Sequence, residues 1–161
     1  MNGSDMMKIT LICVGKLKES YWQSAENEYL KRLGMFAKIE IKEIREESFS
    51  VSTDKEKIKK NEARKIIATI PKDAKIIVLD EIGKEMSSKT FAKQIGDYKN
   101  IGESICLIIG GPLGLDDDLR NSAHDAISLS RLTFTHQMAR VFILEQLYRA
   151  FMISNGRNYH Y

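Results

Sequence analysis

Cysteine, proline and long apolar runs are all scarce in this sequence of 161 residues, which has two cysteines and two prolines. Cys13 and Cys106 lie inside apolar stretches, and their spacing matches neither a disulfide framework nor a zinc motif, so we expect a reduced, cytoplasmic protein. No stretch approaches the roughly 18–20 apolar residues of a membrane span, so we expect no membrane partner. The three histidines lack metal-ligand spacing, and we expect no metal site.

Positive charge exceeds negative charge only slightly, and the formal net charge is +3. This balance permits a nucleic-acid partner without requiring one. The C-terminal stretch 136–161 is more informative, since it holds Arg140, Arg149 and Arg157 against one acid, Glu145. Residues 54–65 mix both signs, and we interpret them as a solvated helix face.

Short apolar runs alternate with amphipathic stretches along the chain. The pattern predicts strands at 8–14, 38–44, 75–79, 104–109 and 126–130, and helices at 20–33, 54–69, 87–98, 117–124 and 135–154. This order is typical of an α/β fold with a mainly parallel sheet and helices on both faces. We expect one domain over 7–161, preceded by a frayed extension at 1–6. Ligands of such sheets bind beyond the carboxyl ends of the strands, here after Leu79, Ile109 and Ser130.

The stretch CLIIGGPLGLDDDL, residues 106–119, places a glycine-rich turn directly after a buried strand. It matches neither G-x-G-x-x-G nor a Walker A loop, and no lysine occurs from Ile105 to Leu119. Asp116, Asp117 and Asp118 would repel a polyphosphate. The loop is therefore either a simple tight turn or the wall of a site for a ligand that is neutral or cationic, such as an adenosine carrying a sulfonium amino acid.

Several segments together resemble the RlmH family of SPOUT-class ribosomal RNA methyltransferases. They are MKITLICVGKLKESYWQSAENEYLKRL, IIGGPLGL, LSRLTFTHQMARVFILEQLYRAFMI and the tail NYHY, in this order. The resemblance implies an α/β domain whose C-terminal segment forms a trefoil knot. It also implies a homodimer that binds S-adenosylmethionine in the knot. The implied reaction is methylation of N3 of a pseudouridine in helix 69 of large-subunit (23S) rRNA, on the assembled ribosome.

The family's site residues can be carried onto matching positions of this sequence. The implied cofactor positions are Leu79, Gly110, Leu129, Ser130, Arg131, Leu132, Thr133 and Phe134. The implied catalytic residues are His136, Arg149, Tyr159 and His160. We expect Arg149 to steady a phosphate or the developing base anion, Tyr159 to stack on the target base, and His160 or His136 to assist proton removal. The alternatives are a local helix-start role for His136 and a surface ion pair for Arg149.

One departure from the family concerns the residue before His136, which is usually proline and here is Thr135, a residue able to cap the last helix. Two other readings of the whole chain remain open at this point. One is a nucleotide-binding α/β protein of another class, which predicts affinity for NAD or ATP. The other is a ribosome-associated binder without catalysis, which predicts RNA binding without cofactor binding.

Overall fold

The protein is built around a five-stranded sheet in which every adjacent pair of strands is parallel. A computed structural model describes residues 6–157 and 159. The strands are β1 (Met7–Val14), β2 (Ala37–Ile44), β3 (Lys75–Glu85), β4 (Ile105–Ile109) and β5 (Asp125–Ser128), in the order β2-β1-β4-β3-β5. The helices are α1 (Ser20–Leu33), α2 (Lys55–Thr69), α3 (Ser88–Asn100), α4 (Asp117–Ser122) and α5 (His136–Ser154). The predicted α/β fold with a parallel sheet is confirmed.

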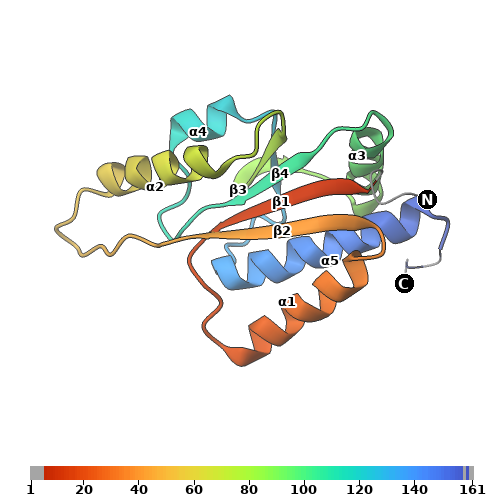
Figure 1. Ribbon diagram of the computed structural model, residues 1–161. Coiled ribbons are helices and arrows are strands. Elements are labelled where there is room, and N and C mark those ends of the chain that lie inside the picture. Colours follow the sequence, from red (N-terminus) through yellow and green to blue (C-terminus); the bar gives the residue numbers. More distant parts are fainter. Residues whose placement is uncertain (1–5, 158, 160–161) are drawn as a thin grey trace.

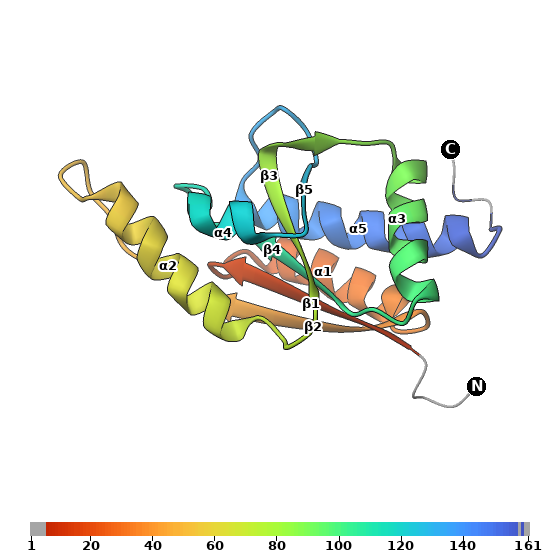
Figure 2. The same ribbon diagram turned by 90° about the horizontal axis from the view of Figure 1, so that it is seen from above.

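Helices cover both faces of the sheet, as Figures 1 and 2 show. One face packs against α1, α3 and α5, and the other against α2 and α4. The central strand β4 is buried throughout because its side chains alternate between two cores. Leu107 contributes to the core beneath α5, whereas Ile108 contributes to the core beneath α2 and α4. This double burial explains why the strand is an unbroken apolar run in the sequence.

The two cysteines are completely enclosed by these cores and carry no disulfide. Burial raises the pKa of both the Cys13 and the Cys106 thiol to about 12. Because the thiolate is the reactive form, we expect neither residue to react with a maleimide at pH 8 while the protein is folded. Both should react after unfolding in guanidinium, as counted by mass spectrometry. Rapid modification of the native protein would contradict this packing.

Strand β3 is longer than the sequence predicts and contains an irregularity. Its pairing with β5 breaks after Leu79↔Ile127 and resumes at Lys84↔Ile127, so residues 80–83 form a bulge. Gly83 allows β3 to approach β5 this closely, because a Cβ on residue 83 would lie 2.7 Å from the Ile127 carbonyl carbon. The three atoms nearest to that position all belong to the backbone of Ala126 and Ile127, which cannot move aside as a flexible side chain could. The bulge therefore places residues 80–83 at the carboxyl edge of the sheet.

Helix α5 runs across the sheet and crosses α3, as seen in Figure 2. Arg140, which is 3% exposed, anchors the helix by pairing with Glu26 of α1 and, at 2.9 Å, with Glu43 of β2. Removing one member of such a buried group would leave a desolvated charge, so we interpret these contacts as fixing the position of α5. Within the described residues, no helix combines the length and apolar composition needed to cross a bilayer.

Candidate functional site

A cavity of about 660 Å³ opens at the carboxyl ends of β3, β4 and β5, and we call it the larger cavity. Its wall includes the implied cofactor positions Leu79, Gly110, Leu129, Ser130, Leu132, Thr133 and Phe134. Arg131 is the exception, because its exposed side chain pairs with Glu85 at 3.1 Å and is not part of the wall. The three strand ends named from the sequence thus converge on one cavity, whose volume suits a nucleoside-sized ligand.

The glycine loop after β4 forms one wall of the larger cavity. An antiparallel bridge joins Gly111 to Gly114, and the Gly114 amide donates to the Gly111 carbonyl at 3.0 Å. Gly114 has a φ of +80°, a conformation that favours glycine. Asp116 ends the turn by capping α4, accepting from the amides of Asp118 and Leu119. The loop is therefore a tight turn and also a cavity wall that presents bare backbone at Gly110 and Gly111.

A buried carboxyl group, that of Glu62 on α2, lies behind this loop. Glu62 is 4% exposed, and its Oε1 accepts from the Glu47 amide at 3.3 Å. A Cβ on Gly111 would lie 3.3 Å from Oε2, so the carboxyl group packs directly against the loop. Burial raises the pKa of Glu62, the Glu47 amide opposes that shift, and the Glu46 carboxylate adds to it. Glu62 therefore supports the glycine loop at an electrostatic cost.

This cost predicts a pH-dependent effect of the Glu62→Gln substitution. A carboxyl group whose pKa is raised by folding contributes stability that is complete below its unfolded pKa, near 4.5, and is lost as the pH rises through the folded value. Glutamine does not ionise, so the variant does not lose this stability as the pH rises. We expect the variant's Tm to match the wild type at pH 4 and to exceed it increasingly toward pH 8. Glu56→Gln, an exposed change on the same helix, is the control, and equal trends in both variants would contradict the assignment.

The bulge at 80–83, which the sequence pattern did not predict, forms the opposite wall. Asp80 pairs with Arg120 of α4 at 2.6 Å, and Glu81 accepts from the Thr133 hydroxyl at 2.7 Å. These contacts tie the bulge to α4 on one side and, on the other, to the loop 129–134, which holds the implied cofactor positions and is called the cofactor loop below. The sequence did not indicate these wall residues, because the apolar run stops at Leu79 and the strand was predicted to end there.

Of the implied catalytic residues that the structure describes, His136, Arg149 and Tyr159, His136 alone lies at the larger cavity. It begins α5, and the preceding Thr135 caps that helix by accepting from the Met138 amide at 3.3 Å, as predicted. Gly15, with a φ of +97°, leaves room for the imidazole, since a Cβ there would lie 2.9 Å from Nε2. Within the described residues this buried Nε2 has no hydrogen-bond partner. Nε2 therefore faces the turn at Gly15 and is closed to solvent, while His136 as a residue lines the cavity.

Arg149 and Tyr159 lie together near the other end of α5. Arg149 donates to Glu145 Oε1 at 2.6 Å and to the Tyr159 carbonyl at 2.9 Å. The Tyr159 ring stacks 4.8 Å from the Arg149 guanidinium carbon and meets Tyr148 edge-on at 5.1 Å. Arg149 thus makes the ion pair with Glu145 and also holds the tail. His160 lies outside the described residues.

The chain does not bring all the implied catalytic residues into one place. His136 and Arg149 lie thirteen positions apart on one helix, which corresponds to about 20 Å along its axis. His136 therefore belongs to the larger cavity, whereas Arg149 and Tyr159 form a separate cluster of aromatic and cationic side chains.

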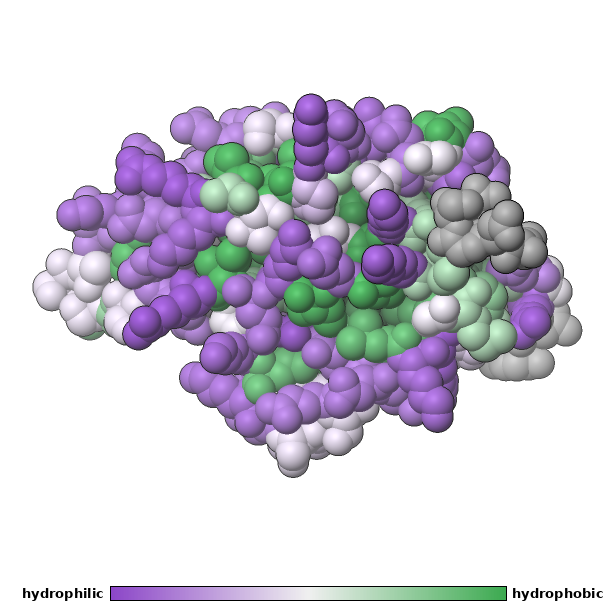
Figure 3. Space-filling view, in the orientation of Figure 1, coloured by the Kyte–Doolittle hydropathy of each residue, from purple (hydrophilic) through white to green (hydrophobic). Residues whose placement is uncertain are grey.

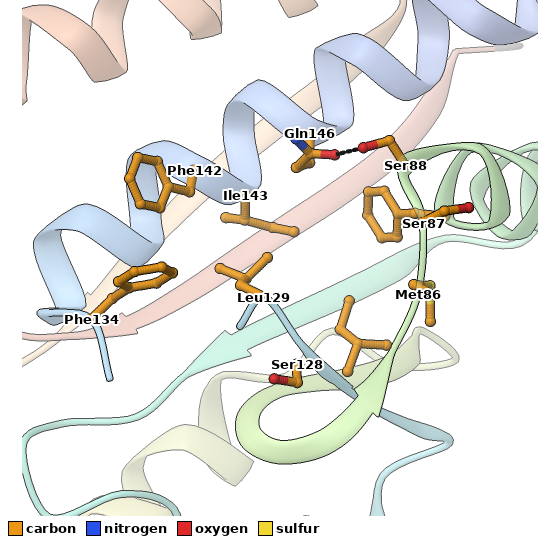
Figure 4. Close-up of a pocket in the computed structure, with 11 residues that line it drawn as sticks. Met86, Ser87, Ser88, Ser128, Leu129, Phe134, Phe142, Ile143 and Gln146 are labelled. Carbon is orange, nitrogen blue, oxygen red and sulfur yellow. Dashed lines mark hydrogen bonds between the residues drawn. The ribbon is translucent and has the colours of Figure 1, made fainter. Parts of the chain in front are cut away.

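A smaller cavity of about 260 Å³ adjoins the larger one, between α3, β5 and α5 (Figure 4). Leu129 and Phe134 line both cavities and separate them. The Phe134 and Phe142 rings meet edge-on at 5.1 Å, and Ser88 donates to Gln146 at 2.7 Å on the opposite side. The aromatic pair therefore supports the cofactor loop from behind.

Comparison with known proteins decides the family. A family model described as "Predicted SPOUT methyltransferase" matches residues 7–160. The ribosomal RNA large subunit methyltransferase H of Lactobacillus acidophilus is 45% identical over 160 residues, covering 96% of this chain and 99% of its own. The proteins of the same name from Clostridium novyi and Acetivibrio thermocellus are 44% and 41% identical, with the same coverage. The chain belongs to the SPOUT methyltransferase family.

Membership in the SPOUT family confirms the resemblance inferred from the sequence and makes the protein a methyltransferase. A solved structure of a Neisseria gonorrhoeae protein placed in the methylase family shares the fold, with a TM-score of 0.53 over 88% of this chain and 81% of that one, at 10% identity. In the part of the chain that the structure describes, no group of His, Cys, Asp or Glu side chains is arranged to hold a metal ion. The trefoil knot stays a prediction.

Proposed function

We propose that this SPOUT methyltransferase binds S-adenosylmethionine in the larger cavity and methylates N3 of a pseudouridine in helix 69 of large-subunit rRNA, on the assembled ribosome. The observation that carries the proposal is the convergence of Leu79, Gly110 and the loop 129–134 on that cavity. The names of the relatives, ribosomal RNA large subunit methyltransferase H, support the RNA substrate.

The residues of the larger cavity fit S-adenosylmethionine by their chemistry. Bare backbone at Gly110 and Gly111 offers peptide groups to a polar ligand, while Leu79, Leu129 and Phe134 offer apolar surface to an adenine ring. Among the described residues that form the wall there is no lysine, and the arginine there, Arg120, already pairs with Asp80. A triphosphate would therefore meet no free cation here, whereas a sulfonium ligand meets carboxylates. This charge balance argues against the reading as an ATP-binding protein.

We further propose a homodimer in which Arg149 and Tyr159 of a second copy complete the site at the larger cavity. The separation of about 20 Å between His136 and Arg149 within one chain supports a composite site. Figure 3 shows hydrophobic surface between polar ridges on the face formed by α1 and α5. Phe142 of α5, which lines the smaller cavity, is 37% exposed. Such a surface fits an isologous contact between two copies.

Each residue then has a defined task. S-adenosylmethionine, when bound, supplies an electrophilic methyl group and leaves as an uncharged thioether, so the chain itself must align the base and remove its N3 proton. His160 of the tail, or His136, accepts that proton. Arg149 steadies the developing anion or a neighbouring phosphate, and Tyr159 stacks on the unpaired base.

The test is methyl transfer to ribosomes isolated from cells that lack this protein. The purified enzyme is incubated with labelled S-adenosylmethionine and either assembled ribosomes or isolated large subunits, and the rRNA is mapped by mass spectrometry. We expect one added methyl on a helix 69 pseudouridine, with assembled ribosomes as the better substrate. RNA binding without methyl transfer would instead favour the non-catalytic binder, and a methyl at another nucleotide would contradict the proposed target.

A further inference from the structure

Among the described residues, the charged side chains that line the larger cavity are those of Asp80, Glu81 and Arg120. Their charges do not sum to zero. Arg120 forms ion pairs with Asp80 at 2.6 Å and with Asp117 at 3.0 Å, so its positive charge is already neutralised by carboxylates. Glu81 forms no ion pair within residues 6–157 and 159. The wall therefore carries a net negative charge whose uncompensated member is Glu81.

The position of Glu81 is fixed by the bulge. Its Oε2 accepts from the Thr133 hydroxyl at 2.7 Å, and Thr133 belongs to the cofactor loop. Its other oxygen, Oε1, has no hydrogen-bond partner in the described part of the chain. Glu81 is exposed to solvent, so its carboxylate is a negative charge at the wall of the larger cavity rather than a buried structural group.

We propose that Glu81 is a specificity-determining residue by which the cavity prefers the sulfonium cofactor to its thioether product. This inference rests on the proposed use of S-adenosylmethionine. In the reaction the sulfur–methyl bond breaks, the new bond forms at N3, and the N3 proton is transferred to a base. The sulfur thereby loses its positive charge and takes both electrons of the broken bond. A carboxylate at the wall favours the charged ligand and not the product, which assists exchange of spent for fresh cofactor.

The prediction concerns the ratio of two affinities, measured by calorimetry with S-adenosylmethionine and S-adenosylhomocysteine at low ionic strength. Glu81→Gln keeps an oxygen that can accept from Thr133 but removes the charge. We expect it to lower the preference for S-adenosylmethionine about three- to tenfold, as expected for unit charges several ångströms apart in a partly solvated site. Affinity for S-adenosylhomocysteine should stay unchanged. Added salt should reduce the wild-type preference and have little effect on the variant.

A matched control separates the charge of Glu81 from the total charge of the protein. Glu103→Gln removes a charge at the opposite end of the sheet, where Glu103 pairs with Lys75, and should leave the affinity ratio unchanged. A Glu81→Gln variant that weakens both ligands equally, or neither, overturns the inference. A wild-type protein that binds neither ligand overturns the proposed function itself.

Discussion

Replacement of Gly83 by alanine is expected to abolish cofactor binding and to lower the free energy of unfolding by at least about 1–3 kcal/mol, the usual cost of overpacking a rigid site. The added Cβ would lie 2.7 Å from the Ile127 carbonyl carbon and 2.8 Å from the Ile127 nitrogen. Neither atom is able to rotate away, so β3 must separate from β5. The bulge at 80–83 would then release Thr133 and the cofactor loop.

The matched control for this prediction is Gly96→Ala in α3. A Cβ at that position would lie 3.7 Å from the Ser154 hydroxyl, an ordinary contact. Glycine inside a helix costs about 0.5–1 kcal/mol relative to alanine, so this variant should be slightly more stable than the wild type. Thermal unfolding and calorimetry with S-adenosylmethionine measure both effects. A Gly83→Ala variant with wild-type Tm and wild-type affinity would show that the bulge does not hold the cofactor loop.

Single substitutions of His136 and Arg149 by alanine are each expected to reduce methyl transfer at least about a hundredfold, the lower range for loss of a proton-transfer group or an anion-stabilising donor. The informative sample is a co-expressed mixture of the two variants. If one site takes His136 from one chain and Arg149 from the other, a heterodimer contains one site with neither substitution. Random pairing should then restore about a quarter of wild-type turnover.

A composite site and a site within one chain give opposite results in this mixture. If both residues acted in the same chain, every site in the heterodimer would carry one substitution and turnover would stay at the level of the single variants. A control mixture of His136→Ala with the double variant should show no recovery in either case. Differently tagged chains purified in tandem confirm that heterodimers are present.

Much of the fold was predictable because local patterns carry it. The buried strand 105–109 is apolar throughout, and the Thr135 cap and the end of α1 at Leu33 follow from residue types near helix ends. Strand order was not predictable, since it depends on contacts between segments far apart in the chain. The bulge at 80–83 was missed for the same reason, because Gly83 is needed only where β3 crosses β5.

The candidate site was likewise predictable from the sequence only in part. Residue chemistry pointed to the three strand ends and argued against a phosphate ligand, and the structure brings those ends together. The roles of Arg149, Tyr159 and His160 came from the family resemblance, because nothing in their spacing distinguishes a functional tail from a surface one. Asp80, Glu81 and Arg120 became visible only when the bulge placed them at the cavity wall.

A crystal structure of the protein grown with S-adenosylmethionine tests the central claim most directly. We predict that the cofactor lies in the larger cavity, in contact with Leu79, Gly110 and the loop 129–134. A second copy of the chain should present its Arg149 and Tyr159 at that cavity. Cofactor density in the smaller cavity behind Phe134 or elsewhere on the surface, or a cavity closed to the partner's tail, would contradict the account.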